Sequence, residues 1–206
     1  MHTFTAVGSA EALSELLIRG EPLPLSEGAD VVIVPTAAAF IGAEASAIEL
    51  AGLFEARGTK VEALMNINRD SSNEPYFAQR LRDAQLVVVS DGSPLHARSV
   101  WRESLAGDAI RDARDVVAIG SVASVFGDVM VDPRGGAPTN GLGYVTGLVM
   151  SVAASEEELA RTRSLLGDDP ILAVLGPYGV VHFDGASWHV LSPDVITTRG
   201  AEPVEL

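Results

Sequence analysis

The stretch that decides the fold reads Val116-Val117-Ala118-Ile119-Gly120-Ser121-Val122-Ala123-Ser124-Val125. Its first four residues are all apolar, which is typical of a short strand buried on both faces. Gly120 then permits a sharp turn, and the small and apolar residues that follow suit the first turn of a helix. We therefore expect a strand, a tight turn and a helix, the unit from which parallel α/β sheets are built.

The rest of the chain repeats this alternation of apolar runs and helical periodicity. The patterns predict helices over residues 10–18, 43–56, 76–84, 96–105 and 156–166. They predict strands over residues 4–7, 31–34, 61–64, 86–89, 116–119, 147–152 and 171–175, and a hairpin over 180–183 and 188–191. Alternating strands and helices favour a three-layer α/β fold. The expected architecture is a mostly parallel, doubly wound sheet that ends in a C-terminal hairpin.

Composition narrows the class of protein. The chain has 206 residues, which fits one α/β domain over residues 1–206. A formal net charge of −14 disfavours binding to nucleic acid or to anionic membrane surfaces. The chain has no cysteine, so thiolate catalysis and thiolate metal sites are excluded. We see no signal peptide and no membrane-spanning run, and we expect a cytoplasmic protein.

The loops that follow the predicted strands at Val34, Val89 and Ile119 share one edge of the sheet. In open α/β sheets, ligands bind beyond the carboxyl ends of the strands. This edge is also where hydrolytic enzymes place a nucleophile, in the pattern G-x-S-x-G. From Gly120 onward, Val122 takes the serine position and Ser124 the closing glycine. We see no phosphate-binding or dinucleotide-binding loop, and we expect no cofactor.

Four stretches in this order resemble those of a known family. They are Val31 to Ala38, Ser90 to Leu95, Gly120 to Gly135, and Gly141 to Leu148. The chain resembles the cyanophycinase and dipeptidase E family of serine peptidases. The resemblance implies a single class I glutamine amidotransferase-like domain, with a serine and a histidine that hydrolyse peptide bonds next to aspartate.

The catalytic features of that family are missing when its motifs are laid on this sequence. The nucleophile falls on Val122, which has no nucleophilic atom. No histidine occurs between His96 and His182, where the resemblance places the catalytic one. The acidic residue expected near Leu175 is replaced by Pro177-Tyr178-Gly179. A valine at φ > 0 would cost about 1–3 kcal/mol, so we expect a relaxed turn or a valine that fills the former pocket.

Our first interpretation is therefore a catalytically inactive homologue that acts as a binding or scaffold protein. The resemblance implies that the amides of Gly92 and Ala123 would form the oxyanion site, and such amides can also hold a carboxylate. We expect a small peptide or carboxylate ligand, and a homodimer is one expected assembly. The candidate ligand-binding residues are Gly92, Ser93, Ala123, Asp132 and Arg134.

A second interpretation is a hydrolase of the cyanophycinase and dipeptidase E type, which uses a serine at a neighbouring position as nucleophile. Ser121 or Ser124 would then attack, with His96 on the neighbouring loop as base. The alternative role for Ser121 is a helix cap. A third interpretation is a non-hydrolytic, amidotransferase-like partner subunit, because such domains typically use a cysteine that this chain lacks.

Other polar residues have simpler interpretations. Arg134 fits a surface salt bridge, and Asp91 fits a solvated loop charge. Asp128 with Asp132, or His182 with His189, could suggest a metal, but capping and solubility are the favoured explanations. No metal site is therefore expected.

Overall fold

Five parallel strands form the centre of a seven-stranded sheet. The computed structural model describes residues 3–152 and 154–206; Met1, His2 and Ala153 lie outside the described residues. The five strands are β1 (Thr3–Val7), β2 (Asp30–Val34), β3 (Lys60–Ala63), β4 (Leu86–Val89) and β5 (Asp115–Ile119), in the spatial order β1-β5-β4-β2-β3. An antiparallel hairpin, β10 (Val180–Phe183) and β11 (Trp188–Val190), extends the sheet beyond β1.

Helices cover both faces of this sheet because successive side chains of a strand point in opposite directions. In β2, Val31 and Ile33 pack with the helices α1 (Ala10–Arg19) and α2 (Ala43–Glu55). Val32 and Val34 pack instead with α3, α4 and α5. These three helices span Pro75–Asp83, Pro94–Trp101 and Leu105–Asp112. The continuous valine runs are thus buried on both sides.

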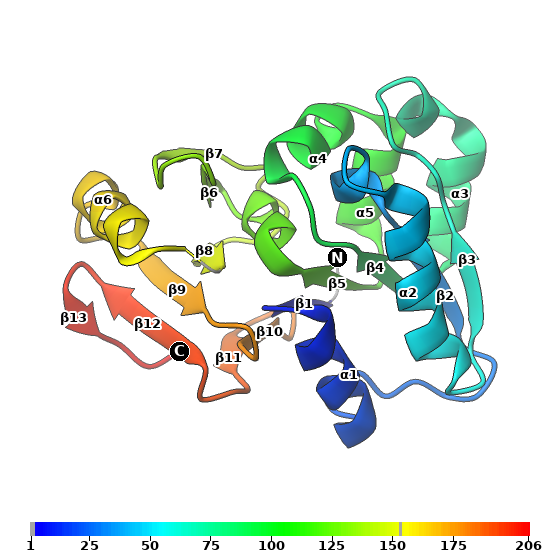
Figure 1. Ribbon diagram of the computed structural model, residues 1–206, viewed down its shortest axis with the longest axis horizontal. Helices are drawn as coiled ribbons and strands as arrows, with labels where there is room; N and C mark the ends of the chain where they lie inside the picture. Colours follow the sequence, from blue (N-terminus) through cyan, green and yellow to red (C-terminus); the bar gives the residue numbers. More distant parts are fainter. Residues whose placement is uncertain (1–2, 153) are drawn as a thin grey trace.

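A second, six-stranded sheet lies at the end of the molecule opposite α2 and α3 (Figure 1). Its strands are β6 (Val129–Val131), β7 (Pro138–Asn140), β8 (Val149–Val152), β9 (Ile171–Leu175), β12 (Val195–Arg199) and β13 (Glu202–Pro203). Helix α6 (Glu156–Leu166) connects β8 to β9. One apolar cluster contains Met130, Met150 and Leu175 from this sheet together with Phe4 from the other, so a shared core joins the two sheets.

The structure confirms the α/β class and the C-terminal hairpin, and it corrects three details. The predicted helix over residues 96–105 is wrong, because α4 ends at Trp101 and α5 begins at Leu105. Between them Glu103 has φ 56°, and the Ser104 hydroxyl caps α5 by accepting from the Gly107 N–H at 3.0 Å. The strands β6, β7, β12 and β13 were not predicted. The strands also divide between two sheets rather than forming one.

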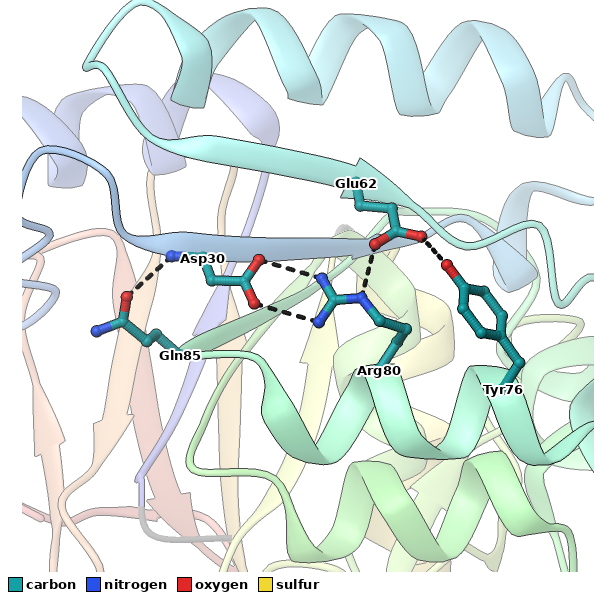
Figure 2. A network of polar contacts seen from close by, with 5 residues as sticks. All are labelled: Asp30, Glu62, Tyr76, Arg80 and Gln85. Atoms are coloured by element: carbon teal, nitrogen blue, oxygen red, sulfur yellow. Dashed lines mark hydrogen bonds and ion pairs between the residues drawn. The ribbon is translucent and has the colours of Figure 1, made fainter.

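A polar network ties α3 to β2 and to the edge strand β3 (Figure 2). The Arg80 guanidinium donates to Asp30 through two nitrogens, at 3.1 and 3.2 Å, and to Glu62 at 2.7 Å. The Tyr76 hydroxyl donates to the other oxygen of Glu62 at 2.6 Å, and Gln85 accepts from the Asp30 N–H at 2.9 Å. These bonds, chiefly the one from Tyr76, lower the pKa of Glu62. Asp30 and Gln85 place one end of the network at the amino ends of β2 and β4, away from the loops described next.

Three 3₁₀ segments complete the described chain: η1 (Thr36–Ala38), η2 (Ser71–Asn73) and η3 (Gly120–Phe126). Two of them follow central strands directly, η1 after β2 and η3 after β5. Over residues 3–152 and 154–206, no helix is long and apolar enough to cross a membrane.

Candidate functional site

The loops after β2, β4 and β5 meet at the carboxyl edge of the central sheet, as the strand order requires. The Ser93 N–H donates to the Ala37 carbonyl at 2.8 Å, which joins the β4 loop to η1. The Ser121 hydroxyl lies 2.8 Å from the Gly92 carbonyl, which joins the β4 loop to η3. This edge is therefore a single hydrogen-bonded unit made from three separate loops.

The sharp residue of the turn after β5 is Gly120. It adopts φ +67°, a conformation that L side chains rarely accept. Val122 is not in that region, and its side chain is fully buried in the shared core. The turn is thus relaxed at Val122, which is one of the two outcomes expected from its β-branched side chain. Gly120, the residue with the positive φ and here called the elbow, therefore lies two positions before Val122.

Asp91 is exposed, as expected of a loop charge, and its carboxylate is also bound at this elbow. Its Oδ1 accepts from the Gly92 N–H at 2.7 Å, from the Ser121 N–H at 3.0 Å and from the Ser121 hydroxyl at 3.1 Å. The two amides that converge on one oxygen are therefore those of Gly92 and Ser121, not those of Gly92 and Ala123. Asp91 performs the capping that was considered for Ser121.

The serine and histidine candidates do not form a catalytic pair. The single proton of the Ser121 hydroxyl is shared between Asp91 and the Gly92 carbonyl. The Ser124 hydroxyl donates to the Ser121 carbonyl at 2.9 Å. His96 lies in α4, where its Nε2 contacts the Ile67 carbonyl at 2.8 Å. Among the described residues, neither serine has a histidine as hydrogen-bond partner, so the displaced serine–histidine pair is absent from this geometry.

A pocket of about 130 Å³ opens beside η3, between that segment, the second sheet and α6. Its walls combine apolar side chains from α4, β6 and β8 with three serines and two carboxylates. The lining residues are Pro94, Ser121, Ser124, Val131, Asp132, Pro133, Gly136, Met150, Ser151, Val152, Ala154 and Glu158. The volume accommodates a small ligand or a single side chain.

Most of the predicted ligand-binding residues have structural roles instead. Gly92 adopts φ +148°, and a Cβ there would lie 2.2 Å from the Ala37 carbonyl oxygen, so the position admits only glycine. The Ser93 hydroxyl caps α4 by accepting from the His96 N–H at 3.2 Å. Ala123 is fully buried. Of the five, only Asp132 lines the pocket.

Asp132 and Arg134 form an ion pair over the exit loop. Arg134 donates to both oxygens of Asp132, at 3.1 Å from Nε and 2.8 Å from a terminal nitrogen. These hydrogen bonds lower the pKa of Asp132, so it is ionised at neutral pH. The guanidinium is 74 % exposed and does not line the pocket. Arg134 thus makes the surface salt bridge that its position suggested.

The structure offers no metal site among the described residues, where no group of three potential ligands gathers. The His182 and His189 rings stack with centroids 6.5 Å apart. His182 Nδ1 instead contacts the Thr5 hydroxyl at 3.0 Å, and His189 Nε2 contacts Asp184 at 2.9 Å. Burial lowers the pKa of His182, and the neighbouring His189 adds to the effect.

Two solved structures of other proteins superpose on this chain over nearly its whole length. A peptidase from an acI-B1 actinobacterium superposes with a TM-score of 0.74 at 18 % identity, covering 100 % of this chain and 94 % of that one. A putative peptidase E protein from Listeria monocytogenes EGD-e superposes with a TM-score of 0.67 at 14 % identity, covering 97 % and 98 %. No protein family profile and no curated protein matches the sequence. The chain therefore shares the fold of peptidase E-type proteins over its whole length.

Sequence reasoning missed several residues of the site. Asp91 had a usable signal, because it follows β4 at the edge where the three loops meet. Met150, Ser151 and Glu158 line the pocket from β8 and α6. Their role depends on how the second sheet docks against η3, which no local pattern indicates.

Proposed function

We propose that the chain is a catalytically inactive homologue of the peptidase E-type enzymes, and that it binds a small ligand in the pocket beside η3. The single observation that carries this proposal is the hydrogen bonding of the elbow. The Ser121 hydroxyl bonds to the Asp91 carboxylate and the Gly92 carbonyl. The Ser124 hydroxyl donates to the Ser121 carbonyl, and Gly120 has no side chain that could react. A serine peptidase needs a hydroxyl in contact with a base that takes its proton.

The pocket favours a ligand that is neutral or carries an ammonium group. Its charged lining residues are Asp132 and Glu158, both acidic. The nearby guanidinium of Arg134 is engaged by Asp132. The hydroxyls of Ser121, Ser124 and Ser151 would provide the polar contacts. A carboxylate would meet like charge on two walls, so we replace the expected carboxylate ligand with a neutral or cationic one.

Labelling with a fluorophosphonate probe tests the loss of catalysis. We expect no labelled serine and no hydrolysis of aspartyl dipeptides, under conditions that label an active serine peptidase of the same fold to completion. Stoichiometric labelling of one serine would contradict the proposal.

The ligand chemistry is tested with three four-carbon molecules of similar size, n-butylamine, butyramide and butyrate. Amide NMR shifts at Ser124 and Ser151 should respond to the amine or the amide at concentrations where butyrate has no effect. A stronger response to butyrate would contradict the charge argument.

A second candidate function is a hydrolase that uses a displaced serine. One observation favours it: Ser121 lines the pocket, and its hydroxyl has a carboxylate partner in Asp91. In that case Ser121→Ala should abolish labelling by the fluorophosphonate, while Ser124→Ala should keep it. If neither the parent protein nor Ser124→Ala is labelled, this candidate is excluded.

A further inference from the structure

Asp91 Oδ1 occupies a position between two backbone amides that come from different loops. The Gly92 N–H belongs to the loop after β4, and the Ser121 N–H to the turn after β5. Both point at the same carboxylate oxygen, at 2.7 and 3.0 Å. The bound anion at this edge is therefore a side chain of the protein itself.

Serine hydrolases with a strand-to-helix elbow use this arrangement for catalysis. Their oxyanion site combines the N–H of the residue after the nucleophile with an N–H from another loop. Here Ser121 is the residue after the turn residue Gly120, and Gly92 supplies the second amide. Asp91 Oδ1 thus fills the place where the charged oxygen of a reacting substrate would lie.

The same carboxylate also fills the space of a side chain at the elbow. A Cβ built on Gly120 would lie 2.2 Å from Asp91 Cγ, 2.3 Å from Oδ1 and 2.4 Å from Oδ2. These distances are far inside van der Waals contact. The carboxylate could make room only by rotating away, and it would then lose its bonds to the two amides and to the Ser121 hydroxyl.

We propose that Asp91 and Gly120 form an internal block of the elbow. The carboxylate accepts hydrogen bonds from both oxyanion amides and occupies the volume that a nucleophile side chain would need. It fits there because residue 120 is a glycine. The block excludes external oxyanions from these amides. It rests on the geometry of the elbow alone and does not depend on which ligand the neighbouring pocket takes.

An ordinary capping aspartate would make the same hydrogen bonds, but its contribution to stability would not depend on the residue at position 120. A cap satisfies free amides at a helix start and needs no glycine opposite its carboxylate. An internal block makes the two positions interdependent, so that a side chain at position 120 is tolerated only once the carboxylate is gone. Coupling between the two positions therefore distinguishes the block from a cap.

A double-mutant cycle on the melting temperature measures this coupling. Gly120→Ala carries a backbone cost from its positive φ in every background, and the cycle cancels it. We expect the drop in Tm caused by Gly120→Ala to be about 5 °C larger in the parent protein than in Asp91→Ala. In Asp91→Asn, which keeps the size of the side chain, Gly120→Ala should remain nearly as damaging as in the parent. Equal drops in the parent and Asp91→Ala would overturn the proposal.

Amide hydrogen exchange gives a second measurement that does not need a folded Gly120→Ala variant. In Asp91→Ala the amides of Gly92 and Ser121 should exchange about tenfold faster or more than in the parent. The Ser93 amide, which donates to the Ala37 carbonyl, is the internal control and should keep its rate. Unchanged exchange at both Gly92 and Ser121 would show that Asp91 does not hold them, and would overturn the proposal.

Discussion

At the scale of single residues, the backbone conformation of one glycine determines how the elbow is interpreted. In the sequence, Gly120 matched the first glycine of the nucleophile motif, and Val122 the serine. In the structure, Gly120 carries the positive φ and Val122 belongs to the core. A glycine can stand either before a sharp turn or within it, and the sequence alone does not distinguish the two.

Substitution of Val122 checks that assignment. Because the side chain is fully buried, Val122→Ala should lower the free energy of unfolding by about 2 kcal/mol. Val122→Ser should lower it by about 1–2 kcal/mol more, since it also buries a hydroxyl. Denaturant titration measures both. Val122→Ser should also remain unlabelled by a fluorophosphonate. Labelling of this serine would show that residue 122 occupies the nucleophile position.

His182 predicts a pH dependence of stability. It is 8 % exposed, and burial lowers its pKa below the ordinary value near 6.5. As the pH falls from about 7 to 5, the unfolded chain therefore takes up this proton before the folded one does, and stability decreases. His182→Gln should show a shallower decrease in the free energy of unfolding over that range. An identical pH dependence in the two proteins would contradict this assignment.

At the scale of elements, the start of α6 illustrates a structure that the sequence determines locally. Ser155 accepts from the Glu158 N–H at 3.3 Å, and the Glu158 carboxylate accepts from the Ser155 N–H at 2.8 Å. This reciprocal pair is a capping box, and a serine three residues before a glutamate is its local sequence signature. Because α6 carries Glu158 into the pocket wall, the cap also fixes one edge of the candidate site.

Removal of the cap should therefore be measurable. Ser155→Ala is expected to lower the free energy of unfolding by about 1 kcal/mol. Ser164→Ala lies in the same helix away from the cap, and should change stability by no more than a few tenths of a kcal/mol in the favourable direction. Equal effects of the two substitutions in chemical denaturation would show that the capping box contributes nothing.

The elements that the sequence predicted well are those with strong local signals. The valine runs of β2 and β4 identified buried strands, and periodic apolar residues identified α1 and α2. The break between α4 and α5 was missed because Ala97, Trp101 and Leu105 keep a four-residue spacing across it, although the Ser104 cap was a readable signal. The strands β7, β12 and β13 are largely exposed and contain no continuous apolar run, so they gave no strong local signal.

At the scale of the whole molecule, one apolar core contains side chains of both sheets. Trp101 from α4 packs edge-on against Phe126 of η3, with ring centroids 6.0 Å apart. Trp188 from the hairpin contacts Phe4, and its indole N–H donates to the Thr146 carbonyl at 2.8 Å. Both tryptophans belong to the cluster that includes Met150 of the second sheet. A single domain over residues 1–206 is therefore the expected unit of folding.

Tryptophan fluorescence tests this expectation. Trp101→Phe leaves Trp188 as reporter, and Trp188→Phe leaves Trp101. In each variant the denaturant midpoint seen by fluorescence should coincide with the midpoint seen by far-ultraviolet circular dichroism, as a two-state transition requires. Two separated midpoints within one variant would show that the sheets unfold independently.

The contact between Asp91 and Gly120 also constrains how this protein can change over evolutionary time. A serine introduced at position 120 alone would collide with the carboxylate. Loss of Asp91 alone would leave two amides without their acceptor and would supply no nucleophile. Each single step is unfavourable and only the pair is tolerated, which is reciprocal epistasis. Exchange of this pair by single mutations would therefore pass through a less stable protein.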